Sequence, residues 1–339
     1  MSRQHDSSLL RADFTERLEI GSIRKFGTIA QAGVGKECDL SIEVPPPLRV
    51  IEVATDDGAI IRVRQHGNPA GPRLTLSHGN GLAIEGYFPF WRELLERYEL
   101  MLFDFRNHGQ NPLHNFTHHS WPQFIHDLER VFDCVQQNFG AKQTAGVFHS
   151  LSAVTAVMQT LRRGKRWDPM VLFDPPFLPP DGHPIRELQR GSEDDIAARA
   201  ERRTASYDDP MELAQQFRRR FRNWQPEAYE LMARATLRFD AINRRWVLAC
   251  PREYEAHIFR SNRETSTWQR LRHMPVALKL ICADPADGGP PALIGRALAA
   301  EAPVAYESIS GTSHFLQIER PHECIRAMEA FLLEHRFIN

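Results

Sequence analysis

The fold depends on residues 144–154, which read TAGVFHSLSAV. The apolar run from 145 to 148 predicts a short buried strand, and a helical pattern begins directly behind it. A serine held in so sharp a strand-to-helix turn, here Ser150, exposes its hydroxyl above the strand ends, as in the nucleophile elbow with its usual pattern G-x-S-x-G. Phe148 and Ser152 stand where that pattern has glycine. Ser152 is small enough for the close approach of strand and helix, but we expect the strand to shift or rotate to seat Phe148, which would then shape the pocket floor.

Length, composition and net charge limit the number of domains and the classes of partner that the chain can have. A chain of 339 residues fits one large α/β domain with an insertion, or two smaller domains, and 42% hydrophobic residues supply a sizeable core. The formal net charge is −1, so no global field attracts nucleic acid or an acidic membrane surface. We therefore expect a small-molecule substrate, no nucleic-acid partner and no membrane partner.

The cysteines and the N-terminus indicate a cytoplasmic protein. Five cysteines lie far apart with no CxxC pair, which is typical of a reducing compartment and not of a disulfide framework. Residues 1–10 are polar and have no apolar signal-peptide core. No apolar run approaches the roughly 18 residues that a membrane span needs.

The order of elements predicts a doubly wound, mostly parallel α/β sheet. Residues 1–47 do not resemble the rest of the chain and are interpreted as an N-terminal arm that packs on the domain or on a second copy in a homodimer. A β-hairpin is expected over residues 48–65, around the turn signal Asp57-Gly58. Strands and helices then alternate, which implies parallel strands joined by right-handed crossovers. The expected strands are 73–77, 99–105, 144–148, 170–173, 276–283 and 304–309, and the expected helices are 87–98, 120–139, 151–163, 292–300 and 321–335.

Between the two halves of this pattern the alternation stops. We interpret residues 177–268 as a helical cap inserted into a core formed by residues 48–176 and 269–339. Its most basic run, residues 218–222, is either a solvated helix face or an anion-attracting rim over the site. Aromatic residues in this segment predict a partly aromatic pocket for a medium-sized organic substrate; they are Trp224, Tyr229, Phe239 and Trp246.

Polar residues follow several of the expected strands, where ligands bind in open α/β sheets. They are His78-Gly79, the segment DFRNHG at 104–109, HSL at 149–151, Asp174, and GTSH at 311–314. Together these motifs resemble the α/β-hydrolase superfamily over about residues 48–335, and most of all its small, cap-bearing bacterial members. The chain order of serine, acid and histidine is also that of this superfamily.

The resemblance implies a role for each of these residues. Ser150 would be the nucleophile and His314 the base that takes its proton. The backbone N–H groups of Leu151 and Asn80 would form the oxyanion hole. Gly79 and His149 would line the substrate pocket. His78 and His108 are interpreted as structural, with His78 orienting its loop through hydrogen bonds.

The acid of the triad is the open point. Asp287 fits the family pattern best, because it lies a few residues past the expected strand and Pro290 and Pro291 follow it. Asp284 is nearer the strand end. Asp174 is a competitor, since some lipases of this fold place the acid after the strand that ends there.

The chemistry expected is serine-dependent hydrolysis of an ester or related acyl compound through an acyl-enzyme, without metal or cofactor. The histidines of residues 114–126 do not have the spacing of an ordered metal motif. A dehalogenase or epoxide hydrolase of this fold would need an aspartate at position 150. Hydrolysis of a carbon–carbon bond or a lactone uses the same triad and stays open, as does a non-catalytic binding protein of this fold with a decayed site.

Overall fold

The computed structural model describes residues 43–263, 266–286 and 289–339. The expected N-terminal arm therefore lies outside the described residues, except for residues 43–47. The same holds for Asp287. Within the described part of the chain, no helix is both long enough and apolar enough to cross a membrane.

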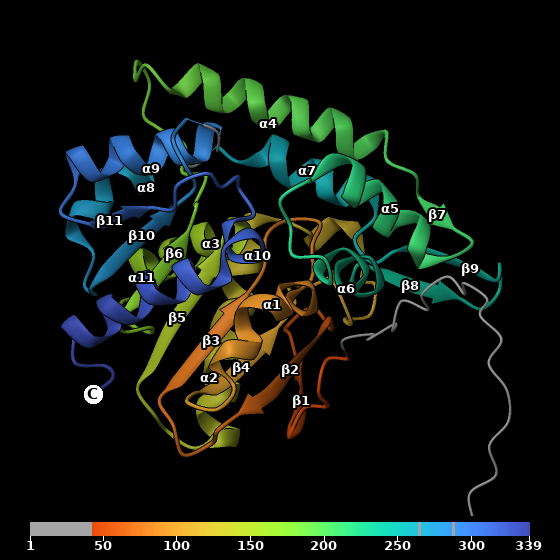
Figure 1. Ribbon diagram of the computed structural model, residues 1–339, viewed down its shortest axis with the longest axis horizontal. Coiled ribbons are helices and arrows are strands. Elements are labelled where there is room, and N and C mark those ends of the chain that lie inside the picture. Colours follow the sequence, from red (N-terminus) through yellow and green to blue (C-terminus); the bar gives the residue numbers. More distant parts are fainter. Residues whose placement is uncertain (1–42, 264–265, 287–288) are drawn as a thin grey trace, which may run out of the picture. The chain divides into compact units, whose positions relative to one another are not determined.

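An eight-stranded sheet forms the centre of the fold, in the order β1-β2-β4-β3-β5-β6-β10-β11 (Figure 1). The hairpin of β1 and β2 is antiparallel, β2 pairs antiparallel with β4, and the remaining neighbours are parallel. This confirms the predicted fold class. The strands are β1 Arg49–Ala54, β2 Ile60–Gly67, β3 Arg73–Ser77, β4 Glu99–Phe103, β5 Thr144–His149, β6 Met170–Phe173, β10 Leu278–Cys282 and β11 Ala305–Ser308.

Helices cover both faces of the sheet because successive strand residues point to opposite sides. Leu100 and Leu102 belong to the core that contains α1 and α11, whereas Met101 and Phe103 belong to the core that contains α2 and α3. The helices of the core are α1 Phe88–Trp91, α2 Trp121–Phe139, α3 Leu151–Arg163, α8 Ser266–Arg270, α9 Pro290–Glu301, α10 Leu316–Glu319 and α11 Pro321–Glu334.

The helix expected over residues 87–98 is much shorter than predicted. Only Phe88–Trp91 is α-helical, and 3-10 turns flank it at Ile84–Tyr87 and Arg92–Leu94. All four residues of α1 are buried. The four residues of α1 therefore have no polar face, and their conformation follows from packing in the core and not from helical periodicity. Two further 3-10 turns lie at Phe116–His118 and Leu271–His273.

The segment between β6 and α8 is not wholly helical, which corrects the expectation of a helical cap. It contains α4 Arg186–Glu201, α5 Pro210–Arg220, α6 Ala228–Ala235 and α7 Arg252–Ser261, and also an antiparallel three-stranded sheet of β7 Ser206–Tyr207, β9 Arg245–Leu248 and β8 Leu237–Asp240. In the hairpin of β8 and β9, strand β8 alternates apolar and polar residues. Phe239 pairs with Trp246 across it, with ring centroids 5.5 Å apart, and such aromatic pairs stabilise antiparallel strands.

Candidate active site

Ser150 occupies a strained turn between β5 and α3. Its backbone angles are φ 53° and ψ −112°, a left-handed conformation that non-glycine residues rarely adopt. Its N–H donates to the Phe173 carbonyl at 3.0 Å, so the turn is tied to the neighbouring strand β6. This is the backbone geometry of a nucleophile elbow, which lifts the serine side chain above the strand ends.

The two departures from the glycine pattern are accommodated in different ways. The Phe148 ring is fully buried in the core on the α3 side of the sheet, 5.3 Å from the Trp167 ring centroid, and does not line the cavity. The expectation that it shapes the pocket floor is therefore wrong. Room for the ring comes from Gly146, where an added Cβ would lie 2.5 Å from Phe148 Cε2. The Ser152 hydroxyl accepts from His149 N–H at 2.9 Å and donates to the His149 carbonyl at 2.8 Å, which closes the turn.

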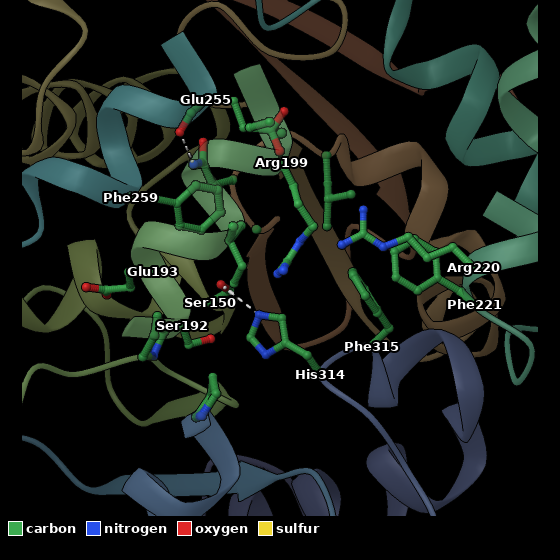
Figure 2. A pocket seen from close by; sticks show the side chains of 18 of the residues that line it. Ser150, Ser192, Glu193, Arg199, Arg220, Phe221, Glu255, Phe259, His314 and Phe315 are labelled. Atoms are coloured by element: carbon green, nitrogen blue, oxygen red, sulfur yellow. Dashed lines mark hydrogen bonds between the residues drawn. The ribbon is translucent and has the colours of Figure 1, made fainter. Parts of the chain in front are cut away.

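Ser150, His314 and Asp174 form a continuous hydrogen-bonded chain. His314 Nε2 lies 3.0 Å from Ser150 Oγ, and His314 Nδ1 lies 2.6 Å from Asp174 Oδ2 (Figure 2 draws the Ser150–His314 contact). A carboxylate only accepts hydrogen bonds, so Nδ1 carries the ring proton and Nε2 is left to accept from the serine hydroxyl. Asp174 is fully buried, and its other oxygen accepts from Ala283 N–H at 3.2 Å.

Of the two candidate acids that the structure describes, Asp174 and Asp284, Asp174 is the one in contact with His314. Asp284 instead accepts from the backbone N–H groups of Gly311 and Ala286, each at 2.9 Å, and so connects two loops. Asp287, the first choice from the sequence, lies outside the described residues. Asp174 follows β6, which lies directly between β5 and β10, and the sequence alone does not reveal this neighbourhood.

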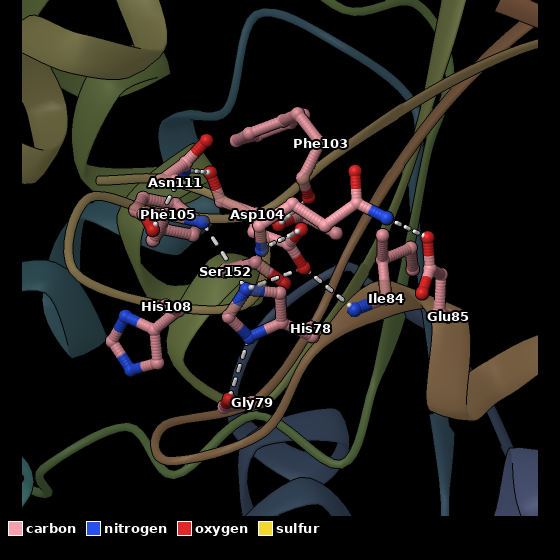
Figure 3. A network of polar contacts seen from close by, with 12 residues as sticks. His78, Gly79, Ile84, Glu85, Phe103, Asp104, Phe105, His108, Asn111 and Ser152 are labelled. Carbon is pink, nitrogen blue, oxygen red and sulfur yellow. Dashed lines mark hydrogen bonds and ion pairs between the residues drawn. The ribbon is translucent and has the colours of Figure 1, made fainter. Parts of the chain in front are cut away.

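Two buried histidines hold the loop that follows β3, as expected for His78 and His108 (Figure 3). His78 Nδ1 donates to the Gly79 carbonyl at 2.8 Å while Nε2 accepts from Phe105 N–H at 3.1 Å. His108 Nε2 accepts from Gly81 N–H at 3.1 Å. Burial lowers the pKa of both rings, in the case of His108 to about 3, so both are neutral.

The loop places Asn80 beside Ser150 at the cavity. The side chain of Asn80 donates from Nδ2 to the Glu255 carbonyl at 2.9 Å. Its backbone N–H has no hydrogen-bond partner in the part of the chain that the structure describes. Leu151 is the first residue of α3, and its N–H has no acceptor inside the helix. Within the described ranges, two N–H groups without an acceptor therefore flank Ser150.

Asp104 is buried beneath the loop that follows β3 and accepts a hydrogen bond from the end of that loop. Its Oδ1 accepts from Ile84 N–H at 2.8 Å, and its Oδ2 forms a buried ion pair with Arg64 at 2.9 Å, as Figure 3 shows in part. Opposite charge from Arg64 holds the Asp104 pKa below its ordinary value despite burial.

His149 does not line the cavity, so its assignment to substrate binding is wrong; Gly79 does line it. The ring is 1% exposed and bridges two loops. Its Nε2 donates to the His314 carbonyl at 2.8 Å, and its Nδ1 accepts from the Tyr87 hydroxyl at 2.6 Å. That hydroxyl in turn accepts from Gly79 N–H at 3.2 Å. Burial, with a smaller effect of His314, lowers the His149 pKa well below its ordinary value and keeps the ring neutral.

A cavity of about 320 Å³ lies above Ser150, between the core and the insertion. The four aromatic residues expected to line it do not: Trp224 and Tyr229 are buried and stacked on one another, and Phe239 is exposed beside Trp246. The lining rings are instead Phe217, Phe221, Phe259 and Phe315.

Two helical faces of the insertion supply most of the remaining lining. The face of α4 presents Gln189, Ser192, Glu193, Ile196, Arg199 and Ala200, and the face of α5 presents Leu213, Gln216, Phe217 and Arg220. Both sets follow the three- and four-residue spacing of one side of a helix. That spacing was readable in the sequence, but it does not say which side faces the site.

The basic run at residues 218–222 is divided between solvent and the cavity. Arg218 and Arg219 are exposed and do not line the cavity, whereas Arg220 does. Among the residues described, no group of three or more His, Cys, Asp or Glu side chains could hold a metal ion.

Comparison with known proteins agrees with this geometry. A family model described as alpha/beta hydrolase family matches residues 76–327. No curated protein matches the sequence.

Solved structures share the fold at low identity. E-2-(acetamidomethylene)succinate hydrolase has a TM-score of 0.67 and 17% identity, covering 84% of this chain and 99% of its own. A thioesterase domain from the curacin biosynthetic pathway has a TM-score of 0.64 and 17% identity, and the match covers 84% of this chain and 99% of the thioesterase domain. An esterase from Thermogutta terrifontis, bound to malate, has a TM-score of 0.62 and 16% identity, and the match covers 85% of this chain and 99% of the esterase. The family model spans well over half of the chain, so the protein belongs to the alpha/beta hydrolase family and is a hydrolase.

Proposed function

We propose that the protein is a serine hydrolase that cleaves an ester or related acyl compound through an acyl-enzyme. The observation that carries the proposal is the chain from Ser150 Oγ to His314 Nε2, 3.0 Å, and from His314 Nδ1 to Asp174 Oδ2, 2.6 Å, at the floor of a cavity. In this proposal Asp174 takes the place of Asp287 as the acid.

The proposed reaction has two steps. Ser150 Oγ attacks the carbonyl carbon while its proton passes to His314 Nε2, and Asp174 stabilises the imidazolium that forms. The tetrahedral intermediate collapses when the leaving group departs with the proton from His314. Water then attacks the acyl-enzyme with His314 again as base, which releases the acid and restores Ser150.

The free N–H groups of Leu151 and Asn80 are the proposed oxyanion donors. Their value depends on being fixed before the reaction, because donors that need no reorganisation stabilise the transition state most. His78 and His108 fix the loop of Asn80 through Gly79 and Gly81, at 2.8 and 3.1 Å. Removal of one such donor costs about 3–4 kcal/mol in other hydrolases.

A fluorophosphonate probe tests this proposal, because it phosphonylates only an activated serine. We expect wild type to be labelled and Ser150→Ala not to be. The matched control is Ser192→Ala, since Ser192 is a second serine of the same cavity and has no contact with His314 among the described residues. Absence of labelling in well-folded wild type, or equal labelling of Ser150→Ala, would refute the proposal.

A further inference from the structure

Two arginine side chains enter the cavity from the insertion. Arg199 comes from α4 and Arg220 from the last residue of α5. Figure 2 shows both side chains extending toward the space above Ser150 and His314. Both are exposed and not packed into the core, so a ligand in the cavity can reach them.

Neither charge is neutralised within the described part of the chain. The neighbouring Arg203 is paired with Glu255, but Arg199 and Arg220 form no ion pair with a described residue. Among the described residues, the guanidinium of Arg220 has no hydrogen-bond or ion-pair partner and lies over the face of the Phe221 ring, with its central carbon 5.1 Å from the ring centroid. A cation over an aromatic ring keeps its N–H donors free for another partner.

The two guanidinium groups also lie close enough to repel one another. The pKa of Arg220 lies below its ordinary value because its guanidinium is partly desolvated at the cavity and because of the positive charges of Arg199 and Arg203, which the charge of Glu255 offsets only in part. An anion between them would relieve this repulsion, and it would gain from the low dielectric of a partly enclosed site.

The acidic residues of the cavity do not supply that anion. Glu255 is occupied by Arg203. Glu193 accepts from Asn262 Nδ2 at 2.6 Å and from Gln189 Nε2 at 2.9 Å, and Figure 2 shows its carboxyl group pointing away from Ser150. The unpaired positive charge therefore has to be met by a ligand or by solvent ions.

We infer that Arg199 and Arg220 form a carboxylate subsite, and that the substrate is an ester or related acyl compound with a free carboxylate remote from the scissile bond. This inference rests on the proposed function. The planar fork of each guanidinium matches the two oxygens of a carboxylate. A phosphate group shares this chemistry, and the test separates the two. The cavity of about 320 Å³ is at the small end of ligand sites, which fits a short chain between the carboxylate and the reacting carbonyl.

A matched pair of substrates tests the inference. The mono-4-nitrophenyl ester of glutaric acid carries a carboxylate, and 4-nitrophenyl methyl glutarate has the same chain with the charge removed. We expect wild type to prefer the anionic ester in kcat/KM. Arg199→Gln and Arg220→Gln should each lower kcat/KM for the anionic ester about 10- to 100-fold, the value of one charge-assisted hydrogen bond, and leave the neutral ester within about twofold.

Arg219→Gln is the control, because it removes one charge from the same run without touching the cavity. Equal losses in all three variants would assign the effect to long-range charge and overturn the subsite. Equal rates for the two esters in every variant would also overturn it. The neutral ester reports in each case that the variant is folded and active.

A binding measurement separates this inference from the proposed mechanism. Calorimetry with glutarate and with inorganic phosphate on Ser150→Ala requires no turnover. Glutarate binding that is lost in Arg199→Gln and Arg220→Gln supports the subsite even if no ester is hydrolysed, in which case the serine mechanism alone fails. Hydrolysis of the neutral ester without glutarate binding overturns the subsite alone. Binding of phosphate but not of glutarate overturns the carboxylate assignment.

Discussion

Replacement of Asp174 by asparagine should abolish most activity, and the structure gives the reason. One carboxylate oxygen accepts from His314 Nδ1 at 2.6 Å and the other from Ala283 N–H at 3.2 Å. Asparagine has only one oxygen for these two positions. With its oxygen toward His314, its NH₂ group would face the Ala283 N–H, two donors against each other in a fully buried place. With its NH₂ group toward His314, it would force the ring proton onto Nε2, where it faces Ser150 and blocks the base.

The expected loss is about 10³- to 10⁴-fold in kcat. An aspartate-to-asparagine change behind a catalytic histidine in a serine protease costs about 10⁴-fold through the wrong tautomer. At about 1.36 kcal/mol for each factor of ten, this corresponds to about 4–5 kcal/mol of the barrier. The assay is steady-state hydrolysis of a short 4-nitrophenyl ester, with circular dichroism to verify the fold.

Two further variants make the experiment decisive. Asp284→Asn should stay within a few-fold of wild type, because Asp284 serves the loop of Gly311 and does not contact His314. Asp287→Asn tests the acid that the sequence placed first. The reasoning is refuted if Asp174→Asn keeps near wild-type kcat, or if Asp287→Asn alone loses activity.

Two other predictions concern stability. Glu193 is 4% exposed, and burial raises its pKa from 4.5 to about 7, so folding favours its protonated form. The contribution of this group to the free energy of unfolding is fully present below about pH 4.5 and is lost as the pH rises through about 7. The stability of Glu193→Gln relative to wild type should therefore rise between pH 5 and pH 8, by about 3 kcal/mol at most, in urea titrations, and parallel pH profiles would contradict this. Gly146→Ala should destabilise by about 1–3 kcal/mol in the same titrations, because the added Cβ would lie 2.5 Å from the Phe148 ring in the core. Gly191→Ala on the open side of α4, with no atom within 4 Å of its added Cβ, should instead be neutral or stabilising by up to about 1 kcal/mol, and equal losses at both positions would argue against a steric cause.

Much of the core was predictable because its determinants are local. Strand and helix periodicity located β3, α2, α3 and β6 closely, and polar residues at strand ends indicated where the site lies. The contacts of His78 and His108 also agree with the structural functions expected from the sequence. Each of these inferences needs only neighbouring residues and the rule that parallel strands end at one edge.

The features that the sequence could not predict depend on tertiary arrangement. The place of Asp174 beside His314 follows from strand order, since β6 lies between β5 and β10 while His314 enters from beyond β11. The cavity lining depends on which sides of α4 and α5 face the core. Periodicity identifies a side of a helix but not its partner, and so the aromatic residues chosen from composition were the wrong ones.

The elbow departs from the usual pattern by lacking both glycines, and the structure shows how its geometry is kept without them. Glycine before the nucleophile provides space, and here Gly146 provides it two residues earlier on the same side of β5 as the Phe148 ring. Glycine after the nucleophile allows close approach, and Ser152 allows it too, being fully buried. Its hydroxyl also bonds both the N–H and the carbonyl of His149, at 2.9 and 2.8 Å, which a glycine could not do. The neighbours of Ser150 thus hold it at φ 53° with the hydroxyl of Ser152 satisfied, so the departure from the usual pattern is a different construction of the same geometry.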